Sequence, residues 1–230
     1  MISSKKFIKK YFLNLSGALL LLLILFSGAL FFFGVLINEV ILEKEDGVDI
    51  RTFYFIGNHI IDPSLTPLMK WVTYFASATF LQIGYGILIV LYLLFKDYKR
   101  AVEIGIIGLG GYLVNYFMKL FFHRPRPLNP LIDPLKNFSF PSGHATSGFI
   151  FYGLLIYLIW KTNFPLLYKY LAAAFLFLFA LLIGFSRIYL RVHFLTDVVA
   201  GFCVGLAWLS LVIWLMEFLK QKSERQLQRS

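Results

Sequence analysis

Long apolar runs, separated by short charged clusters, make up most of the chain. Between Lys10 and Glu39 there are 28 consecutive uncharged residues, and between Lys70 and Lys96 there are 25. Because about 20 apolar helical residues cross the hydrocarbon core of a bilayer, both runs predict membrane-spanning helices. Four further runs are shorter or carry an ionisable residue at one end: Glu103 to Lys119, His144 to Lys161, Lys169 to Arg187 and Asp197 to Glu217. The pattern predicts six transmembrane helices with both termini on one side.

Composition leads to the same class of protein. Of the 230 residues, 59% are hydrophobic and 15% are charged, and the mean hydropathy is +0.76. A soluble domain of this size could not bury so much apolar surface, and an aromatic content of 19% excludes a disordered chain. The single cysteine, Cys203, excludes a disulfide scaffold. The first run is too long for a signal-peptide core, so it is interpreted as a retained anchor. We expect an all-α, polytopic membrane protein with one domain over residues 1–230.

The basic residues predict the orientation. The segments on the side of the termini hold 13 basic and four acidic residues, a net charge of +9, whereas the other side has nine basic and eight acidic residues. The more basic side is expected to be cytoplasmic. Its basic residues are Lys5, Lys6, Lys9, Lys10, Lys96, Lys99, Arg100, Lys161, Lys169, Lys220, Lys222, Arg225 and Arg229. The net charge of +10 therefore indicates contact with anionic lipid headgroups and no nucleic-acid partner.

The loop between the first two spans contains an amphipathic repeat. Apolar residues recur there at helical spacing, at Ile50, Phe53, Ile56, Ile60 and Ile61, and Pro63 ends the run. Segment 50–62 is therefore predicted to form a short interfacial helix in the membrane surface. A partial lid over a binding site and a plain packed connector both fit this pattern.

Chemistry-bearing residues gather on the predicted outer face. If the last four spans alternate across the membrane, four helix ends meet there, and they carry Lys119, His144, Arg187, His193 and Asp197. Each has a plain structural interpretation. Basic residues at helix ends often extend to headgroups, a serine before an apolar run often caps a helix, and a lone histidine is more often a satisfied polar residue than a catalyst.

Three motifs occur in order along this part of the chain: Lys119 with Arg126-Pro127, the stretch Pro141-Ser142-Gly143-His144, and Ser186-Arg187 with His193 and Asp197. Together they resemble the signature of the type 2 phosphatidic acid phosphatase superfamily, which includes bacterial membrane lipid phosphatases and the vanadium haloperoxidases. The motifs are complete and cover roughly residues 119 to 197. The resemblance implies that His193 is a nucleophile that forms a phosphohistidine. It also implies that His144 protonates the leaving oxygen and then activates water.

The residue types agree with phosphate chemistry. Lys119, Arg126 and Arg187 supply cations for a phosphate group. The backbone N–H groups of Ser142, Gly143 and His144 would point outward at a helix start, where anions bind, and the Ser142 hydroxyl adds a donor. On one helix, His193 and Asp197 would share a face, so the carboxylate could orient the imidazole.

A metal triad of His144, His193 and Asp197 is the competing interpretation. The neighbouring cations would repel a divalent metal ion, so we expect no metal and no organic cofactor, and activity that survives EDTA would exclude the metal site. Arg124, Lys136 and Arg191 lie near the motifs, where headgroup contacts or loop packing are expected.

The sequence thus predicts a membrane phosphatase that hydrolyses a phosphomonoester or pyrophosphate on a lipid headgroup at the non-cytoplasmic face. By family analogy, phosphatidylglycerol phosphate ranks first as substrate and undecaprenyl pyrophosphate is close behind, followed by phosphatidate and its lyso form. A phosphotransferase, a catalytically silent scaffold and an anion transporter or channel are the alternatives. The oligomeric state is not predicted.

Overall fold

The structure is a computed structural model that describes residues 2–227, and every regular element in this range is helical. The elements are α1 (Ile2–Ile37), the π-helical turn η1 (Asn38–Leu42), α2 (Gly47–His59), α3 (Thr66–Tyr74), α4 (Ala78–Leu94), α5 (Tyr98–Phe122), α6 (Gly143–Trp160), α7 (Leu166–Tyr189) and α8 (Leu195–Leu227). The side chains of residues 2–16, 225 and 227 lie outside the description. The predicted cytoplasmic residues Lys5, Lys6, Lys9, Lys10, Arg225 and Arg229 are therefore not placed.

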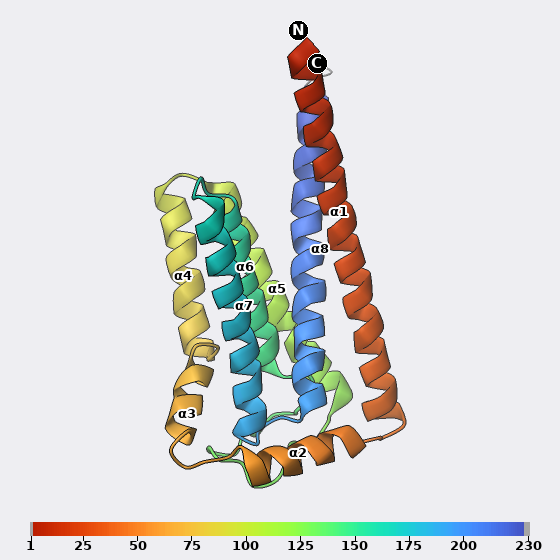
Figure 1. The fold of residues 1–230 in the computed structure, drawn as a ribbon, viewed down its shortest axis with the longest axis vertical. Coiled ribbons are helices and arrows are strands. Elements are labelled where there is room, and N and C mark those ends of the chain that lie inside the picture. The colour runs from red at the N-terminus through yellow and green to blue at the C-terminus, as the bar shows by residue number, and fades with distance from the viewer. Residues whose placement is uncertain (1, 228–230) are drawn as a thin grey trace.

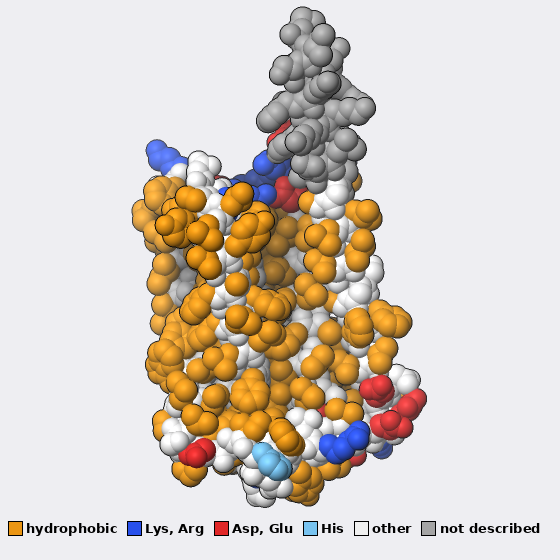
Figure 2. Space-filling model, viewed as in Figure 1, with side chains coloured by type: hydrophobic (Ala, Val, Ile, Leu, Met, Phe, Trp, Pro, Cys, Tyr) orange, Lys and Arg blue, Asp and Glu red, His pale blue; other side chains and the backbone are white. Residues whose placement is uncertain are grey.

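The prediction of six membrane-spanning helices is confirmed. Within residues 2–227, six helices are long and apolar enough to cross a bilayer: Gly17–Leu42, Thr66–Leu94, Tyr98–Phe122, Gly143–Trp160, Leu166–Tyr189 and Leu195–Glu224. Hydrophobic side chains cover the middle of the face drawn in Figure 2, and charged side chains gather at its two ends. Exposed aromatic and aliphatic residues in such a belt face lipid, because a bilayer solvates them as well as a protein core does.

The helices form a bundle with distinct ends (Figure 1). Helices α1 and α8 run side by side and project beyond the other helices, so both chain ends lie at the same end of the molecule. At the opposite end, α2 crosses beneath α7 and α8, and it contacts both. The loop of residues 123–142 lies at this second end, between α5 and α6. A helix does form in the segment predicted at 50–62, but α2 begins at Gly47 and ends at His59, before Pro63. Its place in the membrane surface stays a prediction.

The second span is interrupted, unlike the single helix that its apolar run predicts. Helix α3 ends at Tyr74, and α4 begins at Ala78. The break follows from a local cap, because the hydroxyl of Ser77 accepts a hydrogen bond from the backbone N–H of Phe80 at 3.2 Å. The separate α3 segment packs against α7 near the end where α2 lies.

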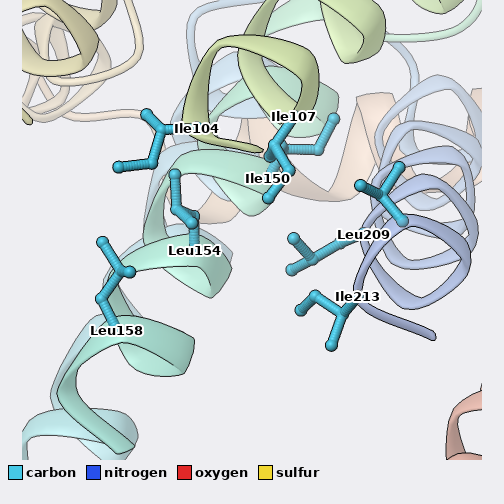
Figure 3. Packing of buried hydrophobic residues seen from close by; sticks show 8 residues of the cluster. Ile104, Ile107, Ile150, Leu154, Leu158, Leu209 and Ile213 are labelled. Carbon is cyan, nitrogen blue, oxygen red and sulfur yellow. The ribbon is translucent and has the colours of Figure 1, made fainter. Parts of the chain in front are cut away.

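The interior is held together by branched aliphatic side chains from three helices. Figure 3 shows α5, α6 and α8 meeting through a cluster of Ile104, Ile107, Ile150, Leu154, Leu158, Leu209, Val212 and Ile213. Close approach also matters, since a Cβ atom built on Gly201 of α8 would lie 2.8 Å from the backbone oxygen of Ser142. Only glycine lets α8 approach the start of α6 this closely. The packing therefore fixes the two helix ends that carry the candidate site.

Candidate active site

The three motifs meet at the end of the bundle that α2 covers. Helix α5 contributes its last turn, α6 and α8 contribute their first turns, and α7 contributes its last turn, while the 123–142 loop joins α5 to α6. These are the four helix ends that the sequence pattern predicts on one face.

Lys119 and Arg126 are held by the loop that follows α5. The Nζ atom of Lys119 donates hydrogen bonds to the backbone oxygens of Phe138 and Ser139, at 2.6 and 3.3 Å. The guanidinium of Arg126 donates to both oxygens of Asn137, at 2.8 Å for the backbone and 2.6 Å for the side chain. Burial lowers the pKa of Arg126 to about 10, so the group remains a cation at neutral pH. The loop thus fixes two positive charges beside the helix ends.

Arg187 lies deeper and has donors to spare. Its side chain is almost fully buried in the last turn of α7, and its Nη1 donates to the hydroxyl of Thr73 in α3 at 2.7 Å. Among the residues that the structure describes, none accepts a hydrogen bond from its Nε. A buried, unpaired donor on a charged group is unfavourable, and a bound anion would satisfy it.

The Pro-Ser-Gly-His stretch forms the start of α6. Ser142 is the N-cap, and its hydroxyl accepts from the N–H of Ala145 at 3.4 Å, which matches the plain capping interpretation. The backbone N–H of Ser142 is already used, because it donates to the backbone oxygen of Asp197 at 2.9 Å. Gly143 and His144 begin the helix and line a cavity with Lys119. The N–H groups left to bind an anion at this helix start are therefore the next ones along α6, which lie beside Lys119.

His193 and Asp197 face each other, although they do not share a helix as expected. Helix α8 begins at Leu195, so His193 lies in the preceding turn and only Asp197 is helical. The helix starts only at Leu195 because the Asp197 carboxylate, in the first turn, accepts the backbone N–H of Phe194 at 2.9 Å. This contact caps the helix at Phe194. His193 Nδ1 still lies 3.4 Å from Asp197 Oδ2. The side chain of His193 is 2% exposed.

The surroundings of the His193 ring define its tautomer. Nε2 lies 3.0 Å from Nη1 of Arg126, and a guanidinium can only donate, so Nε2 is unprotonated and accepts this hydrogen bond with its electron pair. The ring proton of the neutral imidazole therefore sits on Nδ1, which faces Asp197 and the Ser139 hydroxyl at 3.3 Å. Burial lowers the pKa of His193 to about 3, and the nearby cations add to this effect, so the ring is neutral at physiological pH. A neutral imidazole with Nε2 unprotonated is a competent nucleophile.

Two partners of Asp197 have no motif that identifies them. Ser139 donates to Asp197 Oδ2 at 2.5 Å, and Arg124 donates to Oδ1 at 2.6 Å. The sequence predicts headgroup contacts or loop packing for Arg124, but the structure places it inside an ionic network that includes Asp49 of α2. The local sequence carries no signal for these contacts, since Asp49 lies 75 positions from Arg124.

Arg191 and Lys136 differ in their surroundings. The guanidinium carbon of Arg191 lies 4.4 Å from the ring centre of Phe53 in α2, a cation–π contact. Lys136 is exposed. Arg191 therefore holds α2 against the site, as loop packing would predict.

A large cavity opens beside Lys119. Its volume is about 920 Å³, and α4, α5 and α6 line it, with Lys119 and His144 at one end and Gly105 at the other. Lys119 and Gly105 are 14 residues apart on α5, or about 21 Å along a helix that rises 1.5 Å per residue. Most of the wall is apolar, and the lining residues Leu109 and Tyr112 are exposed on the lipid-facing surface. The cavity thus runs from the charged end into the membrane layer and is open sideways.

Over the described residues, no group of three histidine, cysteine, aspartate or glutamate side chains is placed to hold a metal ion. The donor set at the site is instead dominated by cations. Lys119, Arg126 and Arg187 fit an anion far better than a divalent metal.

Comparison with known proteins adds the family. Residues 100–221 match the PAP2 superfamily. The chain is 32% identical over 161 residues to phosphatidylglycerophosphatase B of Bacillus subtilis (66% of this chain, 76% of that protein) and 27% identical over 150 residues to undecaprenyl-diphosphatase BcrC of the same organism (62% and 70%). A crystal structure of a transmembrane PAP2-type phosphatidylglycerolphosphate phosphatase from Bacillus subtilis superposes with a TM-score of 0.71 at 27% identity, covering 84% of this chain and 96% of that one. The matched region contains all three motifs, and the chain belongs to the PAP2 superfamily, the type 2 phosphatidic acid phosphatases.

Proposed function

We propose that this membrane lipid phosphatase removes phosphate from a lipid headgroup through a phosphohistidine at His193. The observation that carries the proposal is the geometry of that ring. Its Nε2 is unprotonated and faces a fixed guanidinium, and its Nδ1 is directed toward a buried carboxylate. A lone structural histidine has no need of both arrangements.

The first step transfers the phosphoryl group to the enzyme. The electron pair of His193 Nε2 forms a bond to phosphorus while the bond from phosphorus to the lipid oxygen breaks. His144 gives its proton to the departing oxygen. Lys119, Arg126 and Arg187 neutralise the phosphate oxygens and hold the extra charge of the transition state, which is usually the largest contribution to such a rate.

The second step restores the enzyme. His144, now neutral, takes a proton from water as the water oxygen bonds to phosphorus. The bond between phosphorus and Nε2 breaks and returns its electron pair to the ring, so inorganic phosphate leaves and both histidines regain their starting states. Asp197 stabilises the positive charge that the phosphorylated ring carries between the two steps.

The cavity supports a lipid as the substrate. A phosphate bound to Lys119 leaves the attached hydrocarbon chains beside the apolar wall that ends near Gly105. A lipid could enter sideways without pulling its tails out of the bilayer. Among candidate substrates, phosphatidylglycerol phosphate ranks first, because the alignment with phosphatidylglycerophosphatase B covers 76% of that relative. Undecaprenyl pyrophosphate follows, and phosphatidate comes next.

The proposed orientation places the site on the non-cytoplasmic face. The excess of basic residues on the side of the termini supports this orientation by the positive-inside bias. Both chain ends lie at the end of the bundle away from the site. The released phosphate would then enter the external aqueous phase.

The test is phosphate release by detergent-purified protein from a panel of mono- and diphosphorylated lipids, with the His193→Ala variant alongside. We expect one lipid class to be strongly preferred, and we expect the variant to show neither turnover nor a covalent phosphoenzyme. EDTA should leave the rate unchanged. Substantial lipid phosphatase activity in His193→Ala protein would reject the proposed mechanism.

A further inference from the structure

Arg124 forms a bridge between two buried carboxylates. Its Nη1 donates to Asp197 Oδ1 at 2.6 Å, and its Nη2 donates to Asp49 Oδ2 at 2.7 Å. The Arg124 side chain is 10% exposed, and both carboxylates are fully buried. Of these three residues, Asp197 alone belongs to a motif. The bridge connects α2, the 123–142 loop and the start of α8.

The bridge determines how the Asp197 carboxylate is oriented. Oδ2 receives the N–H of Phe194, the hydroxyl of Ser139 and the approach of His193 Nδ1. Among the described residues, the side-chain partner of Oδ1 is Arg124. A carboxylate is planar, so a fixed position for Oδ1 also fixes the direction in which Oδ2 faces the imidazole. Arg124 thus controls a contact that it does not itself make.

Asp49 is anchored to the same helix start. Its Oδ1 accepts the backbone N–H of Thr196 at 2.9 Å, and its Oδ2 accepts the Thr196 hydroxyl at 2.5 Å. Asp49 therefore occupies the positive N-terminal end of α8, where a carboxylate is stabilised. Phe53 lies one turn further along α2 and is held by Arg191. These contacts fix α2 so that its single buried carboxylate meets the guanidinium of Arg124.

The charges explain why two carboxylates share one guanidinium. Arg124 paired with Asp197 alone would form a neutral pair, and it would weaken the attraction of Asp197 for a positively charged ring. With Asp49 included, the three groups carry a net charge of −1 beside His193. This charge opposes the cations that bind phosphate, which otherwise disfavour positive charge on the ring. The trio therefore stabilises the phosphorylated ring without reducing the positive charge at the phosphate.

We propose that Arg124 and Asp49 are positioning residues for phosphoryl transfer, which act on His193 through Asp197. In this role α2 is a fixed part of the catalytic architecture, and the docking of a helix between the first two spans sets the orientation of the nucleophile. The inference rests on the proposed function of His193. It extends that function to residues that touch neither phosphate nor the reacting atoms.

Two variants test the inference from different elements. Asp49→Asn removes a charge with little change of shape. Arg124→Lys keeps the charge but lacks the planar fork that reaches both carboxylates. In each variant kcat should fall about 10- to 100-fold, the range found for residues that orient metal-bound histidines from behind. KM should stay near the wild-type value, and single-turnover formation of the phosphoenzyme should slow in parallel with kcat.

Coupling to the motif aspartate separates positioning from general stability. Because Asp49 acts through Asp197, Asp49→Asn should cause no further loss of kcat in an Asp197→Asn background, whereas independent effects would multiply. The matched controls are exposed residues near Asp49, one directly before α2 and one on it: Asp46→Asn and Arg51→Lys. Both should keep the wild-type kcat.

The outcomes are distinguishable. If His193→Ala retains phosphate release, the proposed function fails first. If His193→Ala is inactive while Asp49→Asn and Arg124→Lys keep the wild-type kcat, only the positioning inference fails. The inference would also be overturned if the two variants changed KM alone, or if the losses of kcat from Asp49→Asn and Asp197→Asn multiplied in the double variant. Loss of folded protein in both variants, seen by thermal melting, would overturn it as well.

Discussion

Arg187→Lys tests the phosphate site where the structure leaves a donor unused. In the wild-type chain, Nη1 of Arg187 is committed to Thr73, while Nε finds no acceptor among the described residues. Lysine keeps the charge but not the second donor in the same plane, so the variant should lose about one charge-assisted hydrogen bond to phosphate. Such a bond is worth ~1.5–3 kcal/mol. At 1.36 kcal/mol per tenfold change in rate, kcat/KM should fall roughly 10- to 150-fold.

The assay is steady-state phosphate release from a short-chain lipid phosphate in detergent micelles. Inhibition by orthovanadate, a mimic of the transferring phosphoryl group, should weaken by a similar factor, since a group that binds the transition state also binds its analogue. Arg100→Lys makes the same arginine-to-lysine change at the end of α5 away from Lys119, and it serves as the control. An Arg187→Lys enzyme with wild-type kcat/KM and wild-type vanadate inhibition would refute the assignment of the unused donor to phosphate.

Four further predictions follow from the same geometry, and the one that concerns pH has two measurements. Asp197→Asn should lower kcat on the order of 10³–10⁴-fold, as in other carboxylate–histidine sites, because the amide cannot accept the Nδ1 proton and the N–H donors together; steady-state kinetics measure it. Since His193 has a pKa of about 3 and acts in its neutral form, phosphoenzyme formation should not fall between about pH 7 and pH 5. The unfolded chain takes up this proton below about pH 6.5, so thermal melts should show folded stability declining as pH falls through that value. Gly201→Ala should cost about 1–3 kcal/mol of stability by overpacking against Ser142, and should lower kcat as well. Gly105→Leu fills an open part of the cavity wall, and it should raise KM for long-chain lipids while a soluble phosphate ester is hydrolysed normally.

The membrane topology could be predicted because a bilayer imposes one length and one polarity on every span. The interruption at Ser77 could not, because one polar residue in an apolar run becomes a cap only where the neighbouring helices let the chain turn. The start of α8 was misplaced for a related reason. Spacing alone puts His193 and Asp197 on one helix face, whereas the carboxylate also binds the N–H of Phe194, and this contact ends the turn before the helix begins.

The candidate site divides in the same way. Its motif residues could be predicted, since their types and order identify phosphate chemistry, and the structure brings their helix ends together. Asp49 and Ser139 could not. An acidic residue in an amphipathic segment is indistinguishable from its exposed neighbours until the fold places it beside a particular arginine. Contacts of this kind depend on distant segments, which no local pattern reports.

The cavity has a charged end and an apolar wall, and this division bears on how substrate choice can change. Every group assigned to phosphate comes from a helix terminus or an adjoining loop, while much of the apolar wall comes from the middle turns of α4 and α5. Substitutions along these turns can therefore reshape the space for hydrocarbon without disturbing the reacting atoms. One scaffold can thus be retuned among lipids that share a phosphate and differ in their tails, by natural drift or by design.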